Sequence, residues 1–119
     1  MENIQSDTLS LTFAALADPT RRGILARLAD GEATVNQLAE PFHLKLPTVS
    51  KHLKVLQRAG LVTQTRKAQW RPCRLEPAPL REVADWVELH RRMWAERYGQ
   101  LEAYLDELKQ QEKDRERNA

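Results

Sequence analysis

The sequence predicts a mainly α-helical domain with one small β-hairpin and a long helix at its C-terminal end. Apolar residues recur at helical spacing in four short segments before residue 60. The segment 61–75 is instead rich in β-forming residues, and helical spacing resumes from residue 80 to about residue 111. Because 119 residues suffice for one modest core, we expect a single domain over 1–119 with about five helices.

The first two helices are separated by a proline. The apolar pattern that starts at Leu9 stops at Asp18, because proline disfavours the helical conformation of the residue before it. Pro19 suits the first turn of a second helix over 19–29, which Asp18 can cap and which Gly31 ends. Its buried positions are predicted to be Ile24, Leu25 and Leu28.

Two further helices precede the hairpin. Thr34 caps the first of them, which ends by Pro41. After a turn through 43–46, Pro47 opens a helix that continues to Ala59 and is closed by Gly60. The predicted buried stripe of this helix is Val49, Leu53 and Leu56.

The hairpin is predicted from strands at 61–66 and 70–75, joined by a basic turn over 67–69. Pro72 cannot donate a hydrogen bond within a sheet, so the second strand should lie at an edge.

The last helix, predicted over 79–111, carries an apolar stripe that one small domain cannot bury. A strict 3–4 spacing selects nine positions from Leu80 to Leu108, and only His90 and Arg97 among them are neither apolar nor aromatic. Such a stripe more often covers a partner subunit, so we expect a homodimer and treat 112–119 as a charged tail. The predicted dimer interface is Leu9, Phe13, Val83, Val87, His90, Trp94, Leu101 and Tyr104.

The distribution of charge points to a polyanionic partner, although the formal net charge is only +2. The segment 20–75 holds eleven Lys and Arg residues against three acids, whereas both flanking segments are net acidic. A basic middle segment of this kind is typical of a surface that faces nucleic acid.

The helices around 34–41 and 47–59, joined by a short turn, form a helix-turn-helix pattern over the core and hairpin segment 8–76. The second helix begins with small polar residues and carries basic side chains. A helix that enters the DNA major groove needs both, because its first turns reach base edges and its basic side chains contact phosphate. Its predicted DNA-contacting residues are Lys45, Thr48, Ser50, Lys51, His52 and Lys54. The hairpin would form a wing on the sugar–phosphate backbone or minor groove through Arg66, Lys67, Gln69 and Arg71.

Several segments together resemble the ArsR family of bacterial winged-helix repressors. They are Ala17-Asp18-Pro19-Thr20-Arg21-Arg22, Ile24-Leu25, Gln37-Leu38-Ala39, the run from Pro47 to Leu56, and Ala59-Gly60-Leu61-Val62. The resemblance covers roughly 10–76 and implies a homodimeric repressor that binds a palindromic operator in double-stranded DNA, often its own promoter. It also implies that Thr48, Ser50, Lys51 and His52 read the DNA.

The sequence departs from the metal-sensing members of that family. Where they carry a Cys-x-Cys pair, this chain has Thr34 and Asn36, which are not soft ligands. On the last helix only Asp85, Glu88 and His90 could serve as ligands, and no second histidine accompanies them. We therefore expect no metal and no cofactor, and the effector stays unknown.

Other classes of protein find little support. The single cysteine, Cys73, excludes an intramolecular disulfide framework and fits a reducing cytoplasm. The acidic start is unlike a signal peptide, and no apolar run approaches the ~20 residues of a membrane span. We see no Gly-rich phosphate loop, nucleophile elbow or paired carboxylates, so we do not expect an enzyme. There are two alternatives. One is a protein-docking module without operator specificity, and the other is a repressor that responds to a metal, a thiol oxidant or a small molecule.

Some residues allow two interpretations. Arg21 and Arg22 could contact phosphate or form a salt bridge with Asp18 or another acid of the cap region. His52 could contact DNA or pack beside Leu53. His43 is expected to be exposed and inert, and His90 to be an interface residue rather than a ligand. Cys73 is expected to pack in the core rather than act as a thiol switch. The aromatic residues Trp70, Trp86, Trp94, Tyr98 and Tyr104 are expected in the core or dimer interface, with a small-molecule pocket beside the last helix as the alternative.

Overall fold

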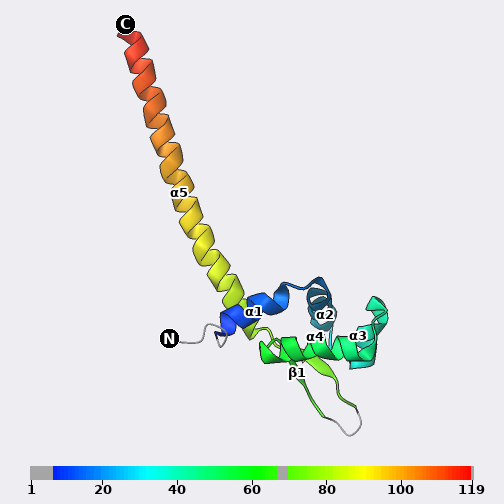
Figure 1. Cartoon of the computed structure of the whole chain (residues 1–119). Helices are drawn as coiled ribbons and strands as arrows, with labels where there is room; N and C mark the ends of the chain where they lie inside the picture. Colours follow the sequence, from blue (N-terminus) through cyan, green and yellow to red (C-terminus); the bar gives the residue numbers. More distant parts are fainter. Residues whose placement is uncertain (1–6, 67–69, 119) are drawn as a thin grey trace. The chain divides into compact units, whose positions relative to one another are not determined.

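The computed structural model describes residues 7–66 and 70–118 of the chain, in two compact units, Met1–Ala84 and Asp85–Ala119. In the described residues the first unit holds four α-helices, a 3-10 turn, a two-stranded antiparallel sheet and the start of a fifth helix (Figure 1). The elements are α1 (Thr8–Leu16), α2 (Pro19–Ala29), α3 (Val35–Ala39), η2 (Glu40–Phe42), α4 (Leu46–Arg58), β1 (Val62–Gln64), β2 (Cys73–Leu75) and α5 (Ala78–Arg117). This order confirms the predicted winged helix-turn-helix class.

Helices α2 and α3 begin, and α4 ends, at the capping residues that the sequence predicts. The Asp18 carboxylate accepts a hydrogen bond from the Arg21 backbone N–H at 3.0 Å, which caps α2. Thr34 and Gln37 form a capping box at the start of α3, because each side chain bonds the backbone of the other. Gly60 follows α4 with a φ of 76°, a conformation that glycine adopts without strain.

The strands are shorter than the segments 61–66 and 70–75 that the sequence predicted. The pairing of β1 with β2 runs from Val62 opposite Leu75 to Gln64 opposite Cys73. Beyond it the Thr65 N–H still donates to the Pro72 carbonyl at 3.1 Å, but proline has no N–H to return the bond. The outer side of β2 is partly covered, because Cys73 also exchanges backbone hydrogen bonds with Ala33.

The core of the first unit holds α4 by one face. Val49, Leu53 and Leu56 are buried, as predicted, with Ile24, Leu25 and Leu28 of α2. Phe42 packs against α2 so closely that a Cβ on Gly23 would stand 2.8 Å from its ring. One face of α4 is therefore buried in the core, and its opposite face is exposed.

Helix α5 has 40 residues, about 60 Å of helix, and continues to Arg117. The tail predicted from residue 112 is thus helical almost to its end, which corrects the sequence interpretation. Hydrogen bonds and ion pairs one turn apart support it, including Gln110 to Asp114 at 3.2 Å and Arg117 to Asp114 at 3.7 Å. Within the first unit, Pro79 is buried and Leu80 packs against the core.

Candidate DNA-binding surface

The face of α4 opposite the core is exposed and carries both basic and small side chains. Pro47, Thr48, Lys51 and Lys54 are exposed, while Ser50 and His52 lie half-buried along the two flanks. Lys45 is exposed just before the helix begins. Apart from Lys45, the predicted contact residues of this segment therefore share one helix, with Thr48, Lys51 and Lys54 on its outer face. A helix that offers hydroxyl and ammonium groups from one face matches the donor and acceptor pattern of a major groove.

One basic residue of this face was not among the DNA contacts predicted from the sequence. Arg58, in the last turn of α4, is exposed and lies one helical turn beyond Lys54. The i, i+4 spacing from Lys54 was the signal that could have revealed it.

The lysine and arginine side chains of this surface have no acidic partners among the described residues. Within residues 7–66 and 70–118, no acid pairs with the side chains of Lys45, Lys51, Lys54, Arg58, Arg66 and Arg71. Unpaired cations on one helix and on the neighbouring hairpin are available to phosphate groups. Lys67 and Gln69, which were also predicted to contact DNA, lie outside the described residues.

A polar hollow of about 580 Å³ lies between α3, α4 and the hairpin. It is lined by Asn36 and Gln37 of α3, Ser50 of α4, and Gln64, Trp70 and Arg71 of the hairpin. The Gln64 side chain donates to the Arg71 carbonyl at 3.2 Å, which braces the two sides of the hairpin.

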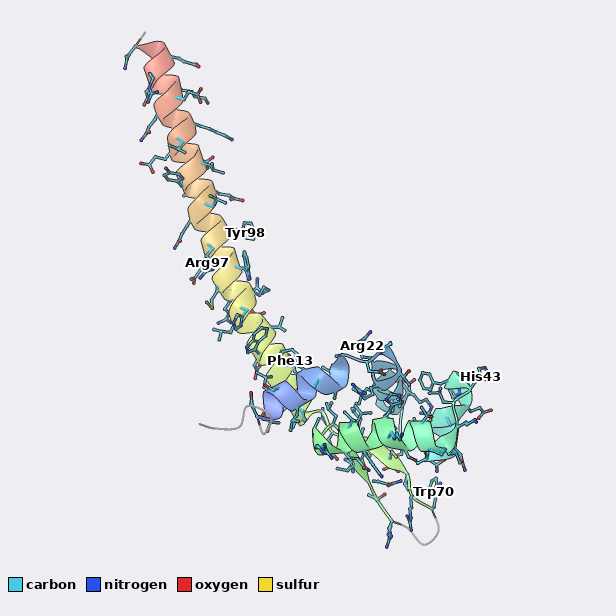
Figure 2. All side chains as sticks on the ribbon, viewed as in Figure 1. Phe13, Arg22, His43, Trp70, Arg97 and Tyr98 are labelled. Atoms are coloured by element: carbon cyan, nitrogen blue, oxygen red, sulfur yellow. The ribbon has the colours of Figure 1, made fainter. Side chains whose placement is uncertain are left out.

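Trp70 is not in the core of this unit, which corrects one half of its sequence interpretation. Its side chain is 55% exposed and stands on the hairpin (Figure 2). Trp70 lies outside the strand β2 (Cys73–Leu75), so the alternation of that strand does not predict its exposure.

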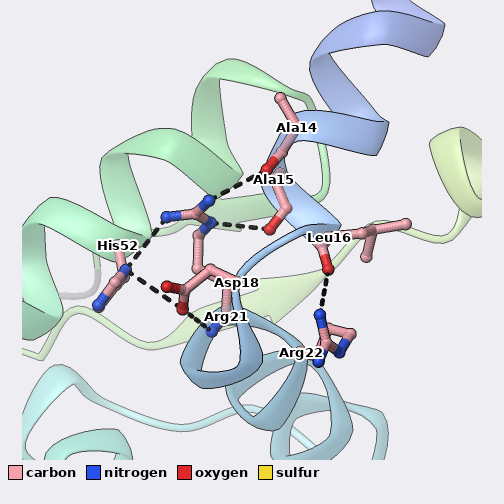
Figure 3. A network of polar contacts seen from close by, with 7 residues as sticks. All are labelled: Ala14, Ala15, Leu16, Asp18, Arg21, Arg22 and His52. Carbon is pink, nitrogen blue, oxygen red and sulfur yellow. Dashed lines mark hydrogen bonds and ion pairs between the residues drawn. The ribbon is translucent and has the colours of Figure 1, made fainter.

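Arg21 and Arg22 have a role that neither sequence interpretation included. The Arg21 guanidinium donates from Nε to the Ala15 carbonyl at 2.7 Å and from Nη2 to the Ala14 carbonyl at 3.0 Å. Arg22 donates to the Leu16 carbonyl at 2.7 Å (Figure 3). These carbonyls lie in the last turn of α1, where helix carbonyls lack their usual partner four residues on, although the Ala14 carbonyl also accepts from the Ala17 backbone N–H at 3.3 Å. The two arginines therefore cap α1, which offsets their unfavourable place at the positive end of α2.

His52 faces the start of α2. Its Nδ1 atom lies 3.4 Å from Nη1 of Arg21 and 3.9 Å from an Asp18 carboxylate oxygen (Figure 3). The pKa of Asp18 is lowered, chiefly by the hydrogen bond from the Arg21 backbone and further by the charge that His52 carries when it is protonated and by the charge of Arg21. The imidazole is thus held in a polar network on one flank of α4.

The other singled-out residues have plain structural partners. The Cys73 side chain is buried, and burial raises the pKa of its thiol, which supports packing rather than a thiol switch. The His90 ring stacks on Trp86 with centroids 3.9 Å apart, and its Nδ1 lies 2.9 Å from the Trp86 carbonyl oxygen. His43 is exposed, as expected.

In the second unit, α5 exposes most of its apolar side chains. Trp94 is 58% exposed, and Val87, Leu101 and Tyr104 are also exposed. Arg97 and Tyr98 stand on the same helix (Figure 2). The helix also carries charged groups, where hydrogen bonds from Arg91 and then Arg92 lower the pKa of Glu88 to about 2. The apolar residues therefore form an uncovered face beside a charged one.

Neither a membrane span nor a metal cluster occurs in the described residues. No helix in that part of the chain is long and apolar enough to span a membrane. Over the same residues, no group of three or more His, Cys, Asp or Glu could hold a metal ion.

Comparison with known proteins identifies relatives of this chain in sequence and in structure. A family model described as a helix-turn-helix domain matches residues 16–65. The transcriptional repressor SdpR of Bacillus subtilis is 36% identical over 75 residues, which cover 63% of this chain and 83% of SdpR. A crystal structure of an ArsR family transcriptional regulator superposes with a TM-score of 0.70 at 39% identity, over 74% of this chain and 97% of that one.

A third relative is a solution structure from Mycobacterium bovis, described as a homodimeric winged helix-turn-helix DNA-binding domain and a possible ArsR-family regulator. It has a TM-score of 0.59 and 28% identity, over 72% of this chain and 80% of that one. Fold, surface and relatives define a winged-helix transcriptional regulator, not an enzyme. The chain belongs to the ArsR family, which confirms the resemblance seen in its sequence.

Proposed function

We propose that the chain is a sequence-specific DNA-binding repressor whose helix α4 reads the major groove. The observation that carries this is the exposed face of α4, where Thr48, Lys51 and Lys54 stand together without acidic partners among the described residues. Side chains in the first turns of such a helix reach the edges of the DNA bases, and lysine and arginine side chains along it bind phosphate.

The hairpin and hollow extend this surface along the DNA backbone. Arg66 and Arg71 supply cations, and the exposed ring of Trp70 supplies an apolar face that can pack on a deoxyribose. These groups contact features that every sequence shares, so they contribute affinity, whereas α4 contributes specificity.

The exposed face of α5 binds a second copy of this chain in the proposal. Trp94, Leu101 and Tyr104 are each more than half exposed, which is costly for a helix in water. The Mycobacterium bovis relative is described as homodimeric. A dimer presents two α4 helices, and its two-fold symmetry matches a pseudo-palindromic operator with half-sites about 34 Å apart.

A repressor of this kind acts where the chromosome is, so the proposal places it in the bacterial cytoplasm. Its operator is proposed to lie in the region upstream of its own gene, as an autorepressor requires. A gel-shift titration against that region, over a salt series, tests the proposal. We expect a sequence-selective complex that weakens steeply with salt. If no selective complex forms even at low salt, the proposal of autorepression through this region is wrong.

A further inference from the structure

The network around Arg21 joins three helices at one point. Arg21 lies in the first turn of α2, and two of its guanidinium nitrogens bind the last carbonyls of α1. The third nitrogen, Nη1, lies 3.4 Å from Nδ1 of His52 on α4 (Figure 3). One side chain thus connects the C-terminus of α1 to the helix that we propose reads DNA.

The chemistry of this contact fixes the proton on the imidazole. Arginine has only donors and stays charged, so a hydrogen bond between these atoms requires His52 Nδ1 to accept. A neutral ring with its proton on Nε2 meets that requirement. The Asp18 carboxylate, 3.9 Å from the same Nδ1, is an acceptor and can bond it only when Nδ1 carries a proton.

We propose that Arg21 is a positioning residue for DNA reading, which holds the flank of α4 through neutral His52. This inference rests on the proposed function, because it explains how the orientation of α4 is maintained. It also gives His52 a role through Arg21 rather than through direct contact with DNA.

Acid should break the connection. The charged groups that face the ring are Arg21 and Asp18 of the α2 start, and α1 contributes only carbonyl groups. On α4 itself, Lys51 and Lys54 are exposed on the outer face. A proton on Nδ1 removes the acceptor that Arg21 uses and favours an ion pair with Asp18. Because the pKa of Asp18 is below its ordinary value of 3.8, its carboxylate stays charged between pH 5 and 8.

The direction in which acid changes DNA affinity distinguishes a His52 that acts through Arg21 from a His52 that contacts DNA directly. Acid adds a proton, and with it a positive charge, to an imidazole. If His52 touched a phosphate, acid would add a favourable charge and strengthen binding. If it acts through Arg21, acid weakens sequence-specific binding, by about tenfold for the loss of one such hydrogen bond.

Two substitutions at one position test the contact. His52→Asn places an amide oxygen near the position of Nδ1 and keeps an acceptor for Arg21. His52→Gln places its amide near Nε2 and removes that acceptor. His43→Asn is the control, because His43 is exposed and Asn tolerates its positive φ of 54°. Affinities for selected and scrambled duplexes are measured at pH 8 and pH 5.5, with urea unfolding of each variant alongside.

We expect the parent protein and His43→Asn to lose selective affinity in acid. We expect His52→Asn to retain selective binding at pH 8 without that pH dependence, and His52→Gln to bind the selected duplex about tenfold more weakly at pH 8. Binding to scrambled DNA should change little in all of them. Loss in His52→Asn with retention in His52→Gln would overturn the proposal in favour of a DNA contact through Nε2.

Two other results would also overturn it. One is parent-like binding by both His52 variants. The other is a loss that merely follows the folded fraction in urea. If the parent itself fails to distinguish the two duplexes, the proposed function fails first. NMR of the imidazole nitrogens at pH 8 then still tests the contact, because a proton on Nδ1 would contradict it.

Discussion

Replacing Lys51 and replacing Arg71 should harm DNA binding in different ways. Lys51 lies on the outer face of α4, which we propose reads base edges, whereas Arg71 lies on the hairpin beside the hollow. A good base contact contributes about 1–3 kcal/mol of discrimination, and a dimer makes it twice. Lys51→Ala should therefore lower the ratio of specific to non-specific affinity roughly thirtyfold or more.

Arg71→Ala should instead act through salt. Removal of one phosphate-binding cation from each of two subunits reduces the slope of log K against log salt by about 1.8, since each cation contributes about 0.9. The affinities of this variant for selected and scrambled DNA should fall together. Lys113→Ala removes the same charge from the far end of α5 and is the matched control.

Fluorescence anisotropy with a selected and a scrambled duplex, between about 50 and 300 mM salt, measures all three variants. The reasoning is refuted if Lys51→Ala and Arg71→Ala behave alike. It is equally refuted if Lys113→Ala matches either of them, because net charge rather than position would then explain binding.

Three further predictions concern assembly, packing and the DNA surface. Leu101→Lys should shift the chain from dimer to monomer in sedimentation, whereas Gln100→Lys, with the same added charge, should not; equal effects would remove α5 as the interface. Gly23→Ala should destabilise the fold by about 1–3 kcal/mol in urea unfolding through its clash with the neighbouring ring, whereas Gly99→Ala, which meets nothing within 4 Å, should stabilise α5 by about 1 kcal/mol. Trp70→Ala should weaken binding to all duplexes with unfolding unchanged, and unaltered affinity would exclude Trp70 from the DNA surface.

Much of the fold follows from residues that act locally. Asp18 with Pro19, Thr34 and Gly60 fix helix ends through backbone chemistry that involves only near neighbours in sequence. The buried face of α4 follows from helical spacing, which needs no knowledge of what packs against it. The outer face of α4, and with it most of the candidate site, was predictable for the same reason.

The parts that sequence reasoning missed depend on contacts between elements. Arg21 bonds carbonyls six and seven residues before it because the chain folds back at Pro19, and no periodicity encodes that turn. Ala33 pairs with Cys73 across 40 residues, so the cover on β2 is not visible locally. Trp70 is hydrophobic by composition, but its place on the hairpin leaves it exposed.

The most direct test of the central claim is selection of binding sites from random-sequence duplex DNA by the full chain. If α4 reads DNA from a symmetric dimer, the enriched sequences should be inverted repeats whose half-site centres are separated by about one helical turn, 10–10.5 base pairs. A recovered pool indistinguishable from the input library would contradict the claim.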